Sequence, residues 1–135
     1  PDLVFAHSAN QAYLQANYSQ AVEDYIEAIR HGYTASDGLI QFVESLQNAQ
    51  SLNTHMEFCR ELISTGTLPP DSLFSMAGAF ESIQNWEMAS LAYDHLIQAG
   101  QATEVVLLQR ARVAGYAGDW DLSTHYLHQL LGGDS

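Results

Sequence analysis

Two histidines near the end of the chain have a spacing that could bind a metal ion or transfer a proton. His125 and His128 stand three residues apart, so both imidazoles would lie on one face of a helix. Asp121 is the carboxylate nearest to them, and both histidines are predicted on the outward side of the last helix. This pattern favours surface histidines, and we predict neither a bound metal ion nor a cofactor.

Four other residues could in principle support catalysis. Cys59 falls on an apolar helix face without a basic neighbour, which is typical of a buried structural thiol and not of a nucleophile. His55 falls between helices, where a hydrogen-bonded packing role is favoured over that of a base. The adjacent Glu23 and Asp24 are predicted on an exposed face. With neither a phosphate loop nor a nucleophile elbow in the sequence, we predict that the chain is not an enzyme.

The composition indicates a folded, strongly acidic domain. The 135 residues are 47% hydrophobic, which is enough for one compact domain over residues 1–135. There are 16 acidic residues against 4 arginines, and the formal net charge is -12. Nucleic acids and anionic membranes are poor partners for such a charge, because arginine and lysine supply most of the affinity for phosphates. A neutral or basic protein or peptide fits better.

The cellular compartment is only weakly indicated by the sequence. A single cysteine, Cys59, excludes an intramolecular disulfide and slightly favours the cytoplasm, without deciding the compartment. No apolar run approaches the roughly 20 residues needed to span a bilayer. Because the chain begins at Pro1 and not at methionine, we expect it to be a piece of a longer protein.

Helix start and stop signals recur every 34 residues. One series has side chains that accept a bond from the free N–H groups of a helix's first turn: Asn17, Ser51, Asn85 and Asp119. A second series has glycines suited to the left-handed turn after a helix: Gly32, Gly66 and Gly100. The shared period predicts an all-α fold of about eight helices, paired within residues 2–35, 36–69, 70–103 and 104–135.

The second of these four units is the least regular. It places His55 where the first and third units have Ala21 and Ala89, so we expect its helices to pack more loosely or in a different arrangement. Its first helix is predicted to begin with Ser36 or Asp37 as the capping residue.

The repeated residues resemble the tetratricopeptide repeat (TPR) pattern over essentially the whole chain. The first unit matches it at Ala9, Ala16-Asn17-Tyr18, Ala21, Tyr25 and Ala28. The third unit matches at Leu73, Ala77, Phe80, Asn85-Trp86, Ala89 and Tyr93, and the fourth at Leu107, Ala111 and Gly118-Asp119-Trp120. The resemblance implies a right-handed α-solenoid of four antiparallel helix hairpins, whose first helices line a concave groove that binds peptides or partner helices.

The groove surface is predicted from residues of the first helices that the apolar stripes do not use. The set is Asn10, Tyr13, Gln41, Glu44, Phe74, Glu81, Leu108, Arg112 and Tyr116. A clamp for acidic peptide tails, known in this family, is disfavoured because its lysine and arginine positions fall on Ala6, Asp71 and Ser75. We therefore expect an interaction scaffold for a neutral or basic peptide. In the alternative interpretation of the same residues, the aromatic side chains pack on neighbouring helices and the glutamates are solvated.

A second function of a different class stays open from the sequence. Repeat solenoids usually end in a polar capping surface, and the last predicted helix carries apolar residues instead, at Leu127, Leu130 and Leu131. The chain could therefore be a structural module that self-assembles, as a homo-oligomer, through its uncapped terminal helices.

Overall fold

The computed structural model describes residues 1–132, and residues 133–135, at the end of the fourth predicted unit, lie outside that range. The described chain is all-helical. Its α-helices are α1 (Asp2–Leu14), α2 (Tyr18–Arg30), α3 (Ser36–Asn48), α4 (Met56–Ser64), α5 (Pro70–Ser82), α6 (Trp86–Gln98), α7 (Glu104–Tyr116) and α8 (Trp120–Gly132). A short 3-10 helix, η1 (Asn53–His55), precedes α4. The odd-numbered helices each begin 34 residues after the previous one, as the sequence period predicts.

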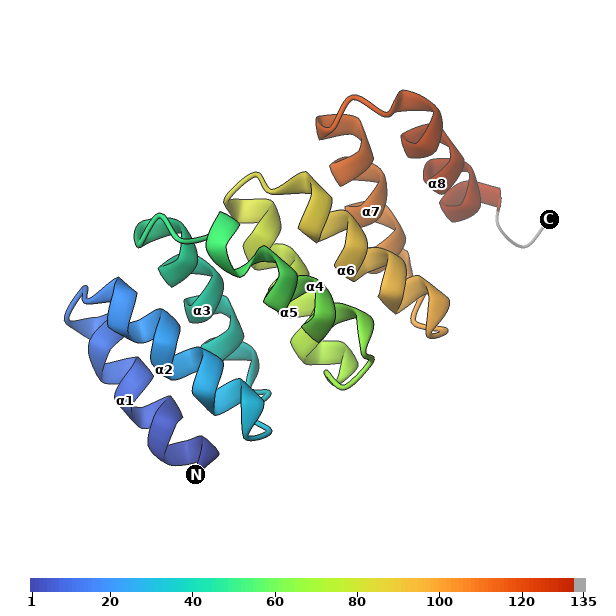
Figure 1. Cartoon of the computed structure of the whole chain (residues 1–135). Helices are drawn as coiled ribbons and strands as arrows, with labels where there is room; N and C mark the ends of the chain where they lie inside the picture. The colour runs from blue at the N-terminus through green and yellow to red at the C-terminus, as the bar shows by residue number, and fades with distance from the viewer. Residues whose placement is uncertain (133–135) are drawn as a thin grey trace.

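The helices form an elongated solenoid of helix pairs (Figure 1). We call α1, α3, α5 and α7 the first row, and α2, α4, α6 and α8 the second row. Within units, α1 packs on α2, α5 on α6 and α7 on α8. Between units, α2 packs on α3 and α6 on α7, while α3 and α5 pack on each other. None of the described helices is long and apolar enough to cross a membrane.

A residue in the left-handed conformation closes most of the helices. Gly32, for example, has φ 97°, and its N–H donates to the carbonyl of Ile29 at 3.0 Å. The turns inside the hairpins use the same device with a non-glycine residue in three units: Ala16, Gln50 and Gln84, with Gly118 in the fourth. Only Gly118 marks these inner turns in the sequence, because a left-handed alanine or glutamine carries no compositional signal.

The predicted helix caps are confirmed at three of the four equivalent positions. Asn17, Asn85 and Asp119 accept from the N–H three residues later at 3.4, 3.0 and 3.1 Å. The prediction for Ser51 is wrong: its hydroxyl is buried without a partner, because the chain continues as a 3-10 turn and α4 begins only at Met56.

The predicted cap at the start of α3 is also wrong. The capping residue is Ala35, which has no side chain that could accept a hydrogen bond. Ser36 and Asp37 lie inside the helix, where the Asp37 carboxylate is in the first turn and can interact favourably with the helix dipole.

The second unit packs differently from the others, as its sequence predicts. The backbones of α3 and α4 do not approach each other closely, whereas α4 packs on α6. Large side chains fill the space between α3 and α4, among them Phe42 and Phe58, whose ring centroids are 6.0 Å apart.

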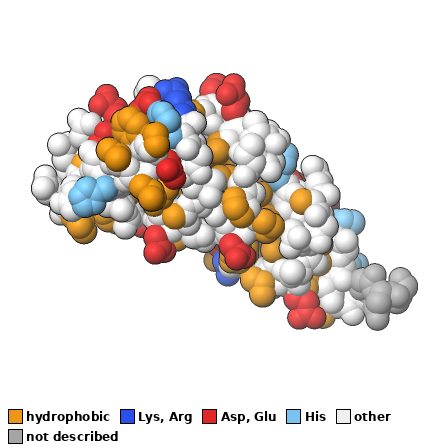
Figure 2. Space-filling model, turned by 90° about the horizontal axis from the view of Figure 1, so that it is seen from below, with side chains coloured by type: hydrophobic (Ala, Val, Ile, Leu, Met, Phe, Trp, Pro, Cys, Tyr) orange, Lys and Arg blue, Asp and Glu red, His pale blue; other side chains and the backbone are white. Residues whose placement is uncertain are grey.

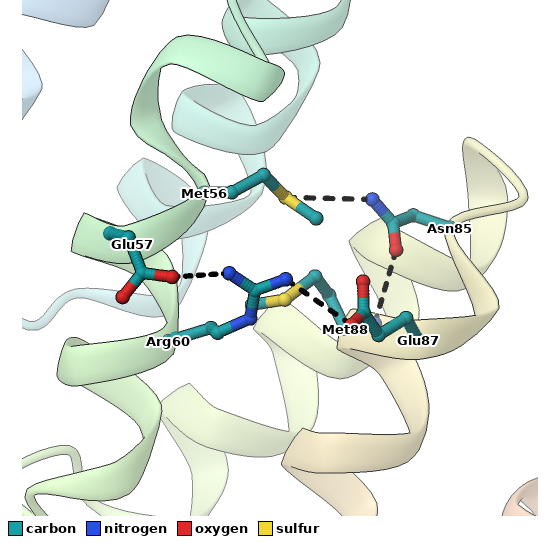
Figure 3. A network of polar contacts seen from close by, with 6 residues as sticks. All are labelled: Met56, Glu57, Arg60, Asn85, Glu87 and Met88. Carbon is teal, nitrogen blue, oxygen red and sulfur yellow. Dashed lines mark hydrogen bonds and ion pairs between the residues drawn. The ribbon is translucent and has the colours of Figure 1, made fainter.

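A polar network ties α4 to the third unit on the second-row side (Figure 3). The Arg60 guanidinium donates to the carboxylate of Glu57 on its own helix and to that of Glu87 on α6, the latter at 3.2 Å. The Asn85 amide, which also caps α6, lies 3.9 Å from the sulfur of Met56. These contacts join α4 to α6, and the charged side chains among them remain partly exposed to solvent.

Candidate interaction surfaces

The predicted polar groove residues link successive first-row helices. The Tyr25 hydroxyl, on a buried ring of α2, is hydrogen-bonded to the side-chain amide of Asn10 on α1, 2.6 Å from Oδ1, and to that of Gln41 on α3. The Tyr13 hydroxyl on α1 donates to the carboxylate of Glu44 on α3 at 2.6 Å. That hydrogen bond raises the pKa of Tyr13 to about 12, with smaller contributions from burial and from the Glu44 charge.

A second link of the same geometry joins α5 to α7. Arg112 Nε donates to the Glu81 carboxylate at 2.8 Å, and the Tyr93 hydroxyl donates to the other oxygen of Glu81 at 3.0 Å. The partners Glu81 and Arg112 are 31 residues apart, as are Tyr13 and Glu44. Six of the nine predicted residues therefore contribute hydrogen bonds between helices, a role that the sequence alone did not indicate.

The three apolar members of the predicted set lie toward the C-terminal half. Phe74 is half-buried and meets Tyr93 edge-on, with centroids 6.0 Å apart. Leu108 is 51% exposed. Tyr116 is exposed on one side and stacks on Trp86 with its other, at 5.1 Å between centroids. These side chains therefore keep surface that a partner could contact.

A cavity of about 210 Å³ opens between α5, α7 and the turn that precedes α7. Most of its wall is apolar, and the Asp71 carboxylate stands in the first turn of α5 at its edge. The lining residues are Pro70, Asp71, Phe74, Leu96, Gln101, Thr103, Val105 and Val106. Of these lining residues, the sequence indicated Phe74 for the groove surface. It missed the turn residues and Leu96, because no periodic pattern marks a turn that happens to border a cavity.

The arginines of the described chain are all paired with carboxylates. Arg30 lies 3.1 Å from Glu27, Arg60 bridges two glutamates, Arg110 lies 2.7 Å from Asp94, and Arg112 pairs with Glu81. The chain has 4 arginines and 16 acidic residues, and most carboxylates within residues 1–132 form no ion pair. Figure 2 shows red acidic side chains scattered among orange apolar ones, with very few blue ones.

Cys59 is buried, and the histidine pair on α8 is exposed. Cys59 is fully buried, and burial raises the pKa of its thiol to about 12, so the reactive thiolate is strongly disfavoured. His125 and His128 are exposed on α8. Across residues 1–132, no three histidine, cysteine, aspartate or glutamate side chains cluster as a metal site would require.

Helix α8 lies at one end of the solenoid (Figure 1), and several of its apolar side chains are exposed. Leu127 is 40% exposed, although the residues at the equivalent position, Tyr25, Cys59 and Tyr93, are fully buried. Leu131 is 87% exposed, whereas Ile63 at its equivalent position is 1% exposed. With Trp120, which is 70% exposed, these leucines form a partly exposed stripe along α8, which we call the α8 stripe.

The opposite end of the solenoid has a different surface. Ser8 and Gln11 on α1, and Gln15 just after it, are exposed at positions where the third unit has the apolar residues Met76, Ala79 and Ile83. The same helix also exposes the apolar side chains of Leu3, Val4 and Leu14. The N-terminal end therefore presents polar and apolar side chains together.

Comparisons with known proteins add no further constraint on the site. No family model matches the chain, and a search of curated proteins finds no relative.

Proposed function

We propose that the chain is an interaction module of the TPR type that holds a neutral or basic peptide against its first-row helices. The cavity between α5 and α7 is the observation that carries this proposal. Its wall of Phe74, Leu96, Val105 and Val106 suits one aliphatic side chain of the peptide, while Asp71 is placed to meet a lysine or arginine beside it.

The energetics favour a cationic peptide with an aliphatic anchor. Burial of an aliphatic side chain contributes roughly 25 cal/mol per Å² of apolar surface removed from water, so the anchor supplies most of the affinity. The excess of unpaired carboxylates speeds association with cations and repels anions. An acidic peptide would meet Asp71 without a compensating cation, since Arg112 is already paired with Glu81.

A matched pair of variants tests the cavity. We expect a nonapeptide with a central leucine flanked by lysines to bind in calorimetry, and its glutamate-flanked counterpart not to bind. Phe74→Ala should weaken binding about tenfold, which corresponds to about 1.4 kcal/mol. Ile40→Ala changes the equivalent position of the second unit and should leave affinity within about twofold. Equal losses in the two variants, or equal binding of both peptides, would contradict the proposal.

A second candidate function, self-association, is supported by the α8 stripe. Two copies could bury Trp120, Leu127 and Leu131 against each other, whereas head-to-tail stacking would place this stripe partly against the polar Ser8 and Gln11 of α1. Sedimentation equilibrium should then show a concentration-dependent dimer that is lost in Leu127→Glu/Leu131→Glu. A chain that stays monomeric at high concentration argues against this second function and leaves the first intact.

A further inference from the structure

Two adjoining cavities separate α2 from α4 in the second row, away from the surface considered above. Their volumes are about 330 and 200 Å³, and Arg30 and Phe58 border both. We call the combined space the α2–α4 cleft. Its walls are Glu23, Ile26, Glu27, Ile29 and Arg30 from α2, and His55, Phe58, Glu61, Leu62 and Thr65 from the segment around α4.

The size of two side chains explains why this cleft is open. His55 and Phe58 line it, while the equivalent positions in α6 are occupied by Ala89 and Ala92, both fully buried. Alanine lets two helix backbones approach closely, and α6 does pack on α4. A histidine and a phenylalanine at the same positions hold α4 away from α2, whose backbones do not approach closely.

The chemistry of the cleft suits a guanidinium group next to aliphatic side chains. Ile26 is buried in its floor, and the ring of Phe58 is half-buried. The chain's own Arg30 shows how a guanidinium fits: it lies 5.7 Å from the centroid of the Phe58 ring and 3.1 Å from the Glu27 carboxylate.

Two carboxylates of the cleft are free to receive another cation. Glu23 and Glu61 are exposed, and neither forms an ion pair within residues 1–132. The four arginines of the chain all pair with other carboxylates, so Glu23 and Glu61 remain available to a cation of a partner.

We propose that the α2–α4 cleft binds an arginine-bearing segment of another protein, with an aliphatic side chain on Ile26 and Phe58 and the guanidinium between Phe58 and the free glutamates. Arginine fits better than lysine, because its planar group stacks on an aromatic ring while it pairs with carboxylates. The inference is independent of the function proposed for the first row, since the two surfaces share no residue.

A titration of the ¹⁵N-labelled chain tests this proposal. The probe is an octapeptide in which two arginines alternate with two leucines, and its control carries citrulline, a neutral isostere, in place of both arginines. We expect amide shifts in α2 and α4 that persist in Phe74→Ala. We also expect about fivefold weaker binding of the citrulline peptide. Shifts confined to the cavity beside Phe74, or equal affinity for the two peptides, would overturn the proposal.

Charge variants separate a specific site from a general attraction to an acidic protein. The double variant Glu23→Gln/Glu61→Gln should weaken binding of the arginine peptide about fivefold. The control Glu104→Gln/Asp121→Asn removes the same charge elsewhere and should change the affinity by less than about twofold. Equal effects of the two double variants would mean that net charge alone attracts the peptide, and the cleft would be rejected as the site.

Removal of the chain's own guanidinium provides an independent test. Arg30→Ala vacates the Phe58 ring and the Glu27 carboxylate, so it should strengthen binding of the arginine peptide about threefold. Arg60→Ala changes the net charge by the same amount at the closed seam with α6 and should have a smaller effect. Weaker binding in Arg30→Ala, or equal gains in both variants, would contradict the proposed mode.

Discussion

The second and third units share one register and differ in how closely their second-row helices pack. In the third unit, Asn85 caps α6, and the buried Ala89 and Ala92 allow close packing. In the second unit, Ser51 caps nothing, and a 3-10 turn leads to a shorter α4. The repeat period thus fixes where helices lie along the chain. The size of the side chains decides which neighbouring second-row helices pack closely and which leave a cleft between them.

The largest expected effect is a loss of folding stability at alkaline pH. It involves Tyr25 and Tyr93, which occupy the same position in the first and third units, where the second unit has Cys59. Burial raises the pKa of Tyr25 and of Tyr93 above the ordinary 10.0, and the Glu81 carboxylate adds to the shift of Tyr93. Below pH 10 both tyrosines are neutral in the folded and unfolded chain, so stability does not depend on them there. Above pH 10 only the unfolded chain ionises, and stability should fall by about 1.4 kcal/mol per pH unit for each tyrosine.

Urea unfolding measured between pH 8 and pH 11.5 checks this expectation. Tyr25→Phe and Tyr93→Phe should each make the alkaline loss of stability less steep. A slope that neither substitution changes would show that these hydroxyls do not resist ionisation in the folded chain.

An enlarged side chain in the third unit should disturb its close packing. Ala92→Phe introduces the residue that the second unit carries at the equivalent position, and no space is available for it because Ala92 is fully buried. We expect a loss of about 2–3 kcal/mol in the free energy of unfolding, measured with urea. Ala99→Phe, at an exposed residue just after α6, is the control and should cost little. Full stability of Ala92→Phe would mean that the seam between α4 and α6 is not tightly packed.

Loss of a capping side chain should matter in the third unit and not in the second. Asn85→Ala removes the side chain that caps α6 and should cost about 1 kcal/mol in thermal or urea unfolding. Ser51→Ala removes a hydroxyl that caps nothing and should change stability by less than about 0.5 kcal/mol. Equal losses in the two variants would mean that Ser51 does cap the helix of the second unit.

The smallest expected effect is at the inner turn of the third unit. Gln84 has φ 62°, a conformation that costs a non-glycine residue roughly 1 kcal/mol. Gln84→Gly should therefore stabilise by about 0.5 kcal/mol after the entropy cost of glycine is subtracted. Gln98→Gly, at the last residue of α6, relieves no left-handed backbone and should not stabilise the chain. Loss of stability in Gln84→Gly would show that the side chain contributes more than the strained backbone costs.

Most of the fold could be predicted because its signals are local. The capping residues Asn17, Asn85 and Asp119 and the glycines at the ends of units mark the helices directly. The start of α4 could not be predicted, because Ser51 is a good capping residue whose role is lost to the packing of its own unit.

The surfaces were less predictable than the helices. The sequence placed Tyr13 and Glu44 on the first-row helices, and a hydrogen bond between the first two units joins them. Such bonds depend on residues about 31 positions apart, and one periodic pattern cannot show which of them meet. The cavity between α5 and α7 and the α2–α4 cleft depend on the volumes of side chains from different units, so only the three-dimensional structure shows them.

A crystal structure of the His55→Ala/Phe58→Ala variant tests the central comparison most directly. If large side chains hold α4 off α2, the variant should show the two backbones closer together, with the α2–α4 cleft narrowed toward the packing seen between α4 and α6. If α4 keeps its place and the cleft is simply enlarged, then side-chain size does not set the spacing of these helices, and the explanation of the open cleft by His55 and Phe58 is wrong.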